Sequence, residues 1–228
     1  MSNQVLIKIE DVSRIFPVPG GEFAALKKIN ATINRGSFTI LKGRSGSGKT
    51  TLMNIVSGLD SPSSGKIFLE DCEISSLSEK ARENLRRKDF GFVFQSVSLI
   101  PSLNAYQNVE FSMRLAGCKI DASTAKRVRD CLKLVGLGNR MTHMPAELSG
   151  GEQQRVAIAR AIAHKPRVIF ADEPTAELDS AMAASVTELF KTMAEKEGIT
   201  ILMTTHDMGL MDAAHSIIEL ENGERIDV

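Results

Sequence analysis

The chain has 228 residues, enough for one domain with a well-buried core or for one domain with a small lobe attached. Its 28 Lys and Arg balance 28 Asp and Glu, so there is no basic excess of the kind that nucleic-acid binders usually show. With no run of about 18 apolar residues and no signal-like start, we expect neither a membrane span nor secretion. Three cysteines without metal-ligand spacing, Cys72, Cys118 and Cys131, are expected to be reduced thiols of a cytosolic protein.

The first third of the chain contains two strand-like runs and one helix. Residues 5–12 (VLIKIEDV) alternate between apolar and polar side chains, as a half-buried strand does. Residues 38–42 (FTILK) predict a second strand that leads directly into a glycine-rich stretch. After this stretch, apolar residues fall at helical spacing, with Gly58 near the predicted end: Leu52, Ile55, Val56 and Leu59.

The remainder predicts a helical middle between further strands. Residues 90–95 (FGFVFQ) are typical of a strand, and residues 98–165 look helical, with one apolar stripe that Gly136 ends. Residues 168–172 (VIFAD) and 200–205 (TILMTT) are apolar without alternation, as are strands buried on both faces of a parallel sheet. Asn222-Gly223 between two short strand-like arms predicts a terminal hairpin. Strands alternating with helices favour an α/β sheet, and the helical middle favours a separate lobe.

The glycine-rich stretch matches a phosphate-binding loop. Gly43, Gly48, Lys49 and Thr50 fit the pattern GxxxxGK[ST] between a strand and a helix. Glycines let several backbone N–H groups face a phosphate, and the next helix adds its positive N-terminus. We expect Lys49 to reach the β- and γ-phosphates and the Thr50 hydroxyl to hold Mg²⁺. The alternative is a chance glycine-rich turn. The residues expected to contact the nucleotide here are Gly43, Arg44, Ser45, Gly46, Ser47, Gly48, Lys49, Thr50 and Thr51.

A second motif, made of two acidic residues, stands at the end of the run 168–172. Asp172 ends the predicted strand and Glu173 comes next. Asp172 suits a carboxylate that holds Mg²⁺ through water, and Glu173 stands where a carboxylate could polarise the attacking water. Taken alone, the motif would more often be a solvated turn than a metal site. Together with the phosphate loop, it predicts a nucleoside triphosphatase.

Residues 148–155 (LSGGEQQR) add a second phosphate-receiving helix start. Ser149 and Glu152 form a capping-box pattern, and Gly150 and Gly151 expose backbone N–H groups. Without the other motifs, an ordinary capped helix would be the better interpretation. With them, the segment resembles the signature LSGGQ of the ABC ATPase family, from which Glu152 departs in place of the commoner Gln.

Further segments resemble motifs of this family in the expected order. Gln95 matches the Q-loop glutamine, His206 the switch histidine, and residues 176–179 with Asp179 the D-loop, where Glu177 replaces the frequent Ala or Asn. Phe16 matches the aromatic residue that stacks on adenine, with Phe23 as a weaker candidate. Taken singly, Gln95 could be a strand-end polar residue, His206 a helix cap and Phe16 a core aromatic.

The stretches FGFVFQSVSLIPSLNAYQNVEF and ADEPTAELDS are similar to the macrolide-exporter, lipoprotein-release and cell-division branch of the family. Members of this branch pair with permeases that have few spans per subunit and a large domain outside the membrane. This resemblance implies a homodimer or pseudo-symmetric dimer on the cytoplasmic face of the membrane, attached through an integral membrane permease. Leu99, Ile100 and Leu103 are candidate permease contacts, unless they pack inside the lobe.

The family resemblance also implies a fold and a mechanism. The fold is a P-loop NTPase core with a mainly parallel sheet, an N-terminal antiparallel β part and a helical lobe. One domain would span residues 1–228, with the core at about 1–95 and 166–228 and the lobe at about 96–165. Two chains would pack head to tail around ATP, with catalytic roles for Lys49, Glu173 and His206 and with Mg²⁺ held by Thr50, Gln95 and Asp172.

Three alternative functions differ from this picture. An ABC ATPase that regulates a cell-wall or division machine through a similar permease cannot be separated from a transporter subunit by the sequence. A DNA-repair or chromosome-organising ATPase carries long coiled coils between its halves, whereas only 53 residues and no heptad run lie between Gln95 and Ser149. A soluble translation factor has two such domains in one chain, and one is found here.

Overall fold

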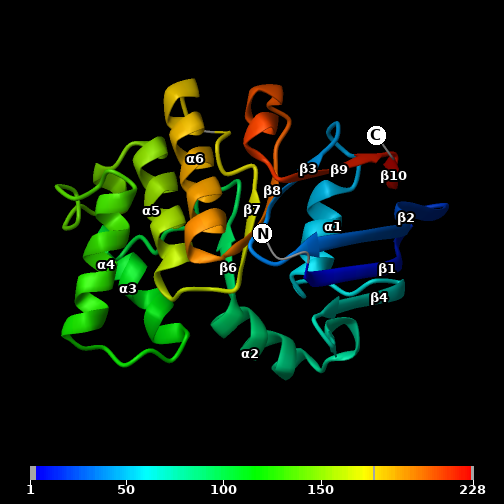
Figure 1. Ribbon diagram of the computed structural model, residues 1–228, viewed down its shortest axis with the longest axis horizontal. Coiled ribbons are helices and arrows are strands. Elements are labelled where there is room, and N and C mark those ends of the chain that lie inside the picture. The colour runs from blue at the N-terminus through cyan, green and yellow to red at the C-terminus, as the bar shows by residue number, and fades with distance from the viewer. Residues whose placement is uncertain (1–3, 177, 227–228) are drawn as a thin grey trace.

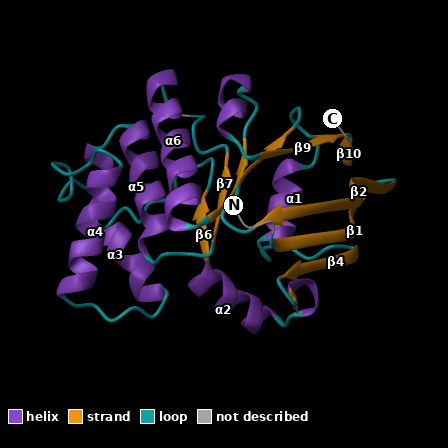
Figure 2. Ribbon diagram, viewed as in Figure 1, coloured by secondary structure: helices purple, strands orange, loops and turns teal. Residues whose placement is uncertain are grey.

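The computed structural model describes residues 4–176 and 178–226, which form two β-sheets with helices around them (Figures 1 and 2). The first sheet is antiparallel, in the order β2-β1-β4-β5. Its strands are β1 (Val5–Val18), β2 (Gly21–Asn34), β4 (Ser64–Leu69) and β5 (Cys72–Glu73). This sheet is the predicted N-terminal antiparallel part.

The second sheet has the order β10-β9-β3-β8-β7-β6 and is parallel except for its terminal hairpin. Its strands are β3 (Phe38–Lys42), β6 (Phe90–Val93), β7 (Val168–Asp172), β8 (Thr200–Thr204), β9 (Ser216–Glu221) and β10 (Glu224–Ile226). The hairpin turns at Asn222 and Gly223, whose φ angles of 50° and 80° are those that a tight hairpin turn needs. The α/β class with a mainly parallel sheet is therefore confirmed.

Helices cover this sheet, and 3₁₀ turns join some of the elements. The α-helices are α1 (Lys49–Val56), α2 (Glu79–Asp89), α3 (Ala105–Leu115), α4 (Ala122–Leu134), α5 (Gly150–Ala163) and α6 (Ser180–Glu197). The 3₁₀ turns are η1 (Ile74–Ser76), η2 (Pro145–Glu147) and η3 (Met208–Ala213). Figure 1 shows α3, α4 and α5 gathered on the side of the molecule away from β1, β2 and β4. In the described residues, no helix is long and apolar enough to span a membrane.

The parallel strands are buried on both faces, as their continuous apolar runs predicted. Alternate residues of a strand point to opposite faces. Ile169 and Ala171 of β7 belong to the core that holds the inner sides of α3 to α6. Val168 and Phe170 belong to the core that α1 shares with the antiparallel sheet. The carboxyl ends of β3, β7 and β8 thus meet at one edge, held between two packed layers.

Candidate functional site

The phosphate loop joins β3 to α1, and two of its glycines are sterically required. Gly43 has φ 154°, and a Cβ there would lie 2.4 Å from both the Leu220 carbonyl oxygen and the Ser47 hydroxyl. Gly48 has φ 104°, and a Cβ there would lie 2.8 Å from the Ala25 carbonyl oxygen. Because the close atoms include backbone of buried strands, a side chain at either position would deform the loop.

Lys49 lies across the loop that it follows. Its side chain is buried, and the ammonium donates hydrogen bonds to the carbonyl oxygens of Gly43 at 2.8 Å and Arg44 at 2.9 Å. The positive charge is therefore held at the N-terminus of α1, where the helix dipole already favours an anion.

At the same edge of the sheet, two hydroxyls meet the carboxylate of Asp172. The Thr50 hydroxyl lies 3.0 and 3.2 Å from the two carboxylate oxygens. The Thr204 hydroxyl donates to one of them at 2.5 Å and accepts the backbone N–H of Glu173 at 2.8 Å. Hydroxyl and carboxylate oxygens are hard ligands, and two protein oxygens beside a phosphate site fit Mg²⁺, which keeps several of its waters and binds substrate phosphates. The described residues hold no group of three or more His, Cys, Asp or Glu of the kind that forms an all-protein metal cage.

Glu173 and His206 lie beside this pair. Glu173 has φ 45°, a left-handed conformation that is uncommon for residues other than glycine. Its carboxylate lies 3.4 Å from Nδ1 of His206, whose side chain is 69% exposed. Residues in such strained backbone conformations cluster at active sites and ligand-binding sites.

One cavity of about 720 Å³ brings most of these side chains together. It unites residues of β2, the phosphate loop and the start of α1 with residues from the segments that follow β6, β7 and β8. The lining residues are Phe23, Ala25, Arg44, Ser45, Gly46, Gly48, Lys49, Thr50, Thr51, Gln95, Glu173 and His206. Gln95 is exposed at its rim. Asp172 is connected to this cavity through Thr50.

The aromatic residue of this cavity is Phe23, whereas the family resemblance indicates Phe16. The two are cross-strand partners in the β1–β2 pair, and such partners share a face of the sheet. Phe23 is 54% exposed, while the Arg14 guanidinium lies over the Phe16 ring, 4.6 Å from its centroid. Both rings therefore stay candidates for stacking on a base.

The Ser149 turn lies outside this cavity. Ser149 caps α5 with a reciprocal pair of hydrogen bonds, its hydroxyl accepting from the Glu152 N–H at 3.3 Å and its own N–H donating to the Glu152 carboxylate at 2.9 Å. The second of these holds the pKa of Glu152 below its usual value, and Arg140, 3.5 Å away, lowers it further. Ser149 and Gly150 are exposed, and Gly151 is partly exposed. The turn is thus a rigid, accessible helix start away from the phosphate loop of its own chain.

Asp179 of the predicted D-loop lies at the start of α6. Asp179 caps α6, its carboxylate accepting the Met182 N–H at 3.0 Å. Glu177, the unusual residue of the predicted D-loop, lies outside the described residues.

The sequence predicted no role for Gln154. It is buried and donates to the carbonyl oxygens of Pro174 at 3.0 Å and Phe94 at 3.4 Å. Helix α5 is therefore joined to the segments that follow β6 and β7.

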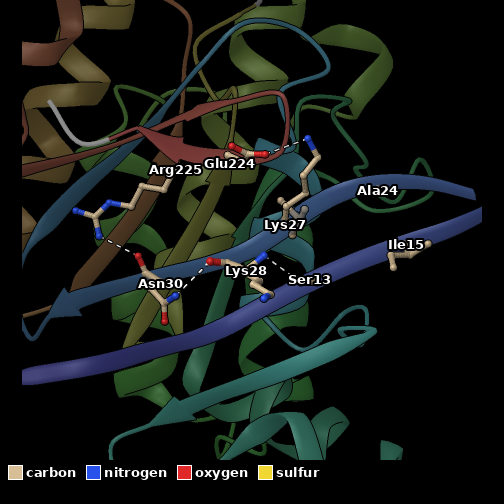
Figure 3. A pocket seen from close by; sticks show the side chains of 9 residues that line it. Ser13, Ile15, Ala24, Lys27, Lys28, Asn30, Glu224 and Arg225 are labelled. Atoms are coloured by element: carbon tan, nitrogen blue, oxygen red, sulfur yellow. Dashed lines mark hydrogen bonds and ion pairs between the residues drawn. The ribbon is translucent and has the colours of Figure 1, made fainter.

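A second cavity of about 720 Å³ lies between β2 and the terminal hairpin (Figure 3). Lys27 pairs with Glu224 at 3.1 Å, and Arg225 donates to the Asn30 carbonyl oxygen at 2.9 Å. None of the predicted site residues lines this cavity. Its side chains fasten the hairpin to the first sheet, and the Gly223 N–H in turn donates to the Ser47 carbonyl oxygen, which supports the phosphate loop.

Comparison with known proteins agrees with this geometry. The sequence model of the ABC transporter family matches residues 26–176. The chain belongs to this family. An uncharacterised ABC transporter ATP-binding protein of Methanocaldococcus jannaschii is 44% identical, with 98% of this chain and 99% of the relative covered. The lipoprotein-releasing ATP-binding protein LolD of Shewanella denitrificans is 39% identical, with 96% and 93% covered.

Two further comparisons concern the branch and the reaction. The macrolide export ATP-binding/permease protein MacB of Vibrio parahaemolyticus is 42% identical over 98% of this chain, which corresponds to 34% of that longer protein. The ATP-binding cassette MJ0796, solved as a dimer in a post-hydrolysis state with ADP and Pi, has a TM-score of 0.92 and 37% identity, with 97% of both chains covered. The chain is therefore an ATP-binding ABC ATPase of the branch that the sequence indicated, and it hydrolyses ATP.

Proposed function

We propose that this ABC ATPase is one half of a two-site motor that drives an integral membrane permease. Two copies pack head to tail, and each ATP lies between the phosphate loop of one copy and the Ser149 turn of the other. The observation that carries this proposal is the separation of the two phosphate-receiving elements. The loop lines the cavity that also contains Glu173 and His206, whereas Ser149 and Gly150 are exposed and line no part of it. The related cassette MJ0796 was solved as a dimer.

Binding of the triphosphate uses the loop and Lys49. Backbone N–H groups of residues 43–48 face the phosphates, and the ammonium of Lys49 exchanges its two loop carbonyls for phosphate oxygens. The buried Ser47 hydroxyl has no hydrogen-bond partner among the described residues, which fits a loop that receives a polar ligand. Phe16 stacks on the adenine.

Thr50, Asp172 and Gln95 hold Mg²⁺ in this proposal. The Thr50 hydroxyl and the Asp172 carboxylate are already within 3.2 Å of each other. When bound, Mg²⁺ neutralises charge on the phosphates and orients them. In the proposed dimer, Asp179 also contacts the nucleotide.

Hydrolysis uses Glu173 and His206. Glu173 orients the attacking water and accepts its proton, and His206 contacts the γ-phosphate. The exposure of His206 and the 3.4 Å approach to Glu173 support this pairing. Catalysis is mostly positioning and charge stabilisation, so the backbone conformation that places the Glu173 carboxylate also contributes.

The Ser149 turn completes the site from the partner copy. The first N–H groups of a helix have no intrahelical acceptors, and the capping box uses those of Ser149 and Glu152. Those of Gly150 and Gly151 remain for an outside phosphate. ATP then joins the two copies, and hydrolysis releases them.

A groove beside the predicted permease contacts supports coupling to a membrane partner. It has a volume of about 480 Å³ and contains Ile100, whereas Leu99 packs partly against the core. Its exposed apolar side chains are Leu59, Phe94, Phe111 and Leu115. Phe94 immediately precedes Gln95, so a permease segment seated in the groove would be linked to the nucleotide cavity. We place the protein on the cytoplasmic face of the membrane, attached through this permease.

Light scattering with a Glu173→Gln variant tests the proposal. Glutamine has the shape of glutamate but accepts no proton, so ATP should stay bound and hold two chains together. We expect a dimer with ATP and Mg²⁺ and a monomer without nucleotide, together with almost no hydrolysis. A monomer under all conditions would contradict the shared site, and turnover at the wild-type rate would remove Glu173 from the proposed role.

A further inference from the structure

Strand β8 ends in a buried threonine that contacts both acidic residues of the site. Thr204 is 0% exposed and lies in register with Asp172 of β7 and Leu41 of β3. Its hydroxyl donates to the Asp172 carboxylate at 2.5 Å and accepts the Glu173 N–H at 2.8 Å. One oxygen atom thus fixes a side chain and the next peptide group together.

This double contact acts where the backbone is under strain. Glu173 has φ 45°, and residues hold such conformations only where the surroundings fix them. Without the Thr204 hydroxyl, the Glu173 N–H would lose this acceptor, and among the described residues the Asp172 carboxylate would keep only Thr50 as a hydroxyl donor. The peptide could then turn, and the Glu173 carboxylate would leave its place beside His206.

We infer that Thr204 is a positioning residue for ATP hydrolysis, one that sets the orientation of Asp172 and Glu173 relative to each other. The inference rests on the roles proposed above for these two acids. It goes beyond them because Thr204 is not among the residues that line the nucleotide cavity. The sequence offered a small signal, since the apolar run 200–205 ends in two threonines.

The same strand supplies a matched control. Thr200 begins β8, is also 0% exposed, and its hydroxyl also accepts a backbone N–H, from Gly36 at 2.9 Å. It lies at the opposite end of the strand from Asp172 and Glu173. Thr200→Val therefore removes an equivalent buried hydroxyl and leaves the acidic pair untouched.

The test compares Thr204→Val, Thr204→Ser and Thr200→Val. For each we would measure kcat and KM for ATP, the affinity for a fluorescent ATP analogue with Mg²⁺ and with EDTA, and the melting temperature. In Thr204→Val we expect kcat to fall about tenfold or more, because a hydrogen bond to a charged group is lost, while KM changes little. Affinity in EDTA should be unchanged, and the gain in affinity on adding Mg²⁺ should shrink. Thr204→Ser should keep both kcat and the gain in affinity on adding Mg²⁺ at wild-type values, and Thr200→Val should change neither.

Other results would overturn the inference. Wild-type kcat and a wild-type gain from Mg²⁺ in Thr204→Val would do so, as would equal losses in Thr204→Ser or Thr200→Val. Should valine prevent folding, Thr204→Cys replaces it, because a thiol is only a weak donor; kcat equal to that of Thr204→Ser would then refute the role. Glu173→Gln is measured alongside. Wild-type turnover there rejects the proposed role of Glu173, whereas an inactive Glu173→Gln beside a fully active Thr204→Val rejects only the inference about Thr204.

Discussion

Replacing the first glycine of the phosphate loop with alanine should be far more harmful than replacing the middle one. A Cβ on Gly43 would lie 2.4 Å from the carbonyl oxygen of Leu220 in β9. Leu220 is only 1% exposed, so the backbone of this buried strand cannot move away. A Cβ on Gly46 would meet no atom within 4 Å. Both residues have positive φ, 154° and 77° respectively. Comparing the two variants therefore separates the energetic cost of the backbone conformation from that of the steric contact.

The geometry gives the sizes of the two effects. Gly46→Ala carries only the left-handed backbone cost of about 1 kcal/mol. Gly43→Ala adds overlap with a fixed backbone atom to its backbone strain, for a combined cost of about 4 kcal/mol. For a chain of this size, about 1 kcal/mol lowers the melting temperature by roughly 2–4 °C. We expect losses of roughly 3 °C for Gly46→Ala and roughly 8–16 °C for Gly43→Ala.

Thermal unfolding of the nucleotide-free protein, followed by circular dichroism, measures this difference without any contribution from ATP. Gly20→Ala is a suitable control, because a Cβ there also meets nothing within 4 Å and its φ is 92°. Equal losses of melting temperature for Gly43→Ala and Gly46→Ala would show that the close approach of Gly43 to β9 carries no energy.

Two further predictions concern the stacking of an aromatic ring on adenine and the capping box at the start of α5. Phe16→Ala should weaken ATP binding by roughly 1–3 kcal/mol in a titration; a loss in Phe23→Ala alone would assign the stacking to the ring that lines the cavity. The Ser149 N–H lowers the pKa of Glu152 in the folded state. The ionised Glu152 side chain therefore stabilises the fold above its ordinary pKa of 4.5, and this stabilisation is lost as the pH falls through the lower pKa of the folded state. Glu152→Gln should therefore match wild type more closely at acid pH than at pH 7 in urea unfolding, and an equal difference at both pH values would contradict this.

Sequence patterns predicted the elements that have one regular buried face. The terminal hairpin and the strands β3, β7 and β8 follow from Asn222-Gly223 and from unbroken apolar runs. The first strand was predicted only over residues 5–12, although it continues to Val18, because β-bulges after Ile9 shift its register and break the alternation. Helix α2 was not predicted, since none of its residues is buried and no apolar stripe marks it.

The site was predictable where one short segment carries the chemistry. The phosphate loop and the pair Asp172-Glu173 are contiguous motifs, so their residue types and order were enough. Thr204 and Gln154 were not predicted because their contacts depend on which strands and segments become neighbours. Phe23 was predicted as the weaker candidate for stacking on adenine, and its position opposite Phe16 depends on the register of β1 and β2.

The most direct test of the shared two-site motor is ATP hydrolysis by a mixture of two inactive variants, Lys49→Ala and Ser149→Arg. In a head-to-tail dimer, the mixed pair regains one complete site, with Lys49 from one chain and Ser149 from the other. Titrating the double variant into wild-type protein should also reduce activity by more than dilution, because each mixed dimer loses both sites. We expect activity in the first mixture that neither variant shows alone. No recovered activity there, together with a loss no greater than dilution in the second mixture, would contradict the shared two-site motor.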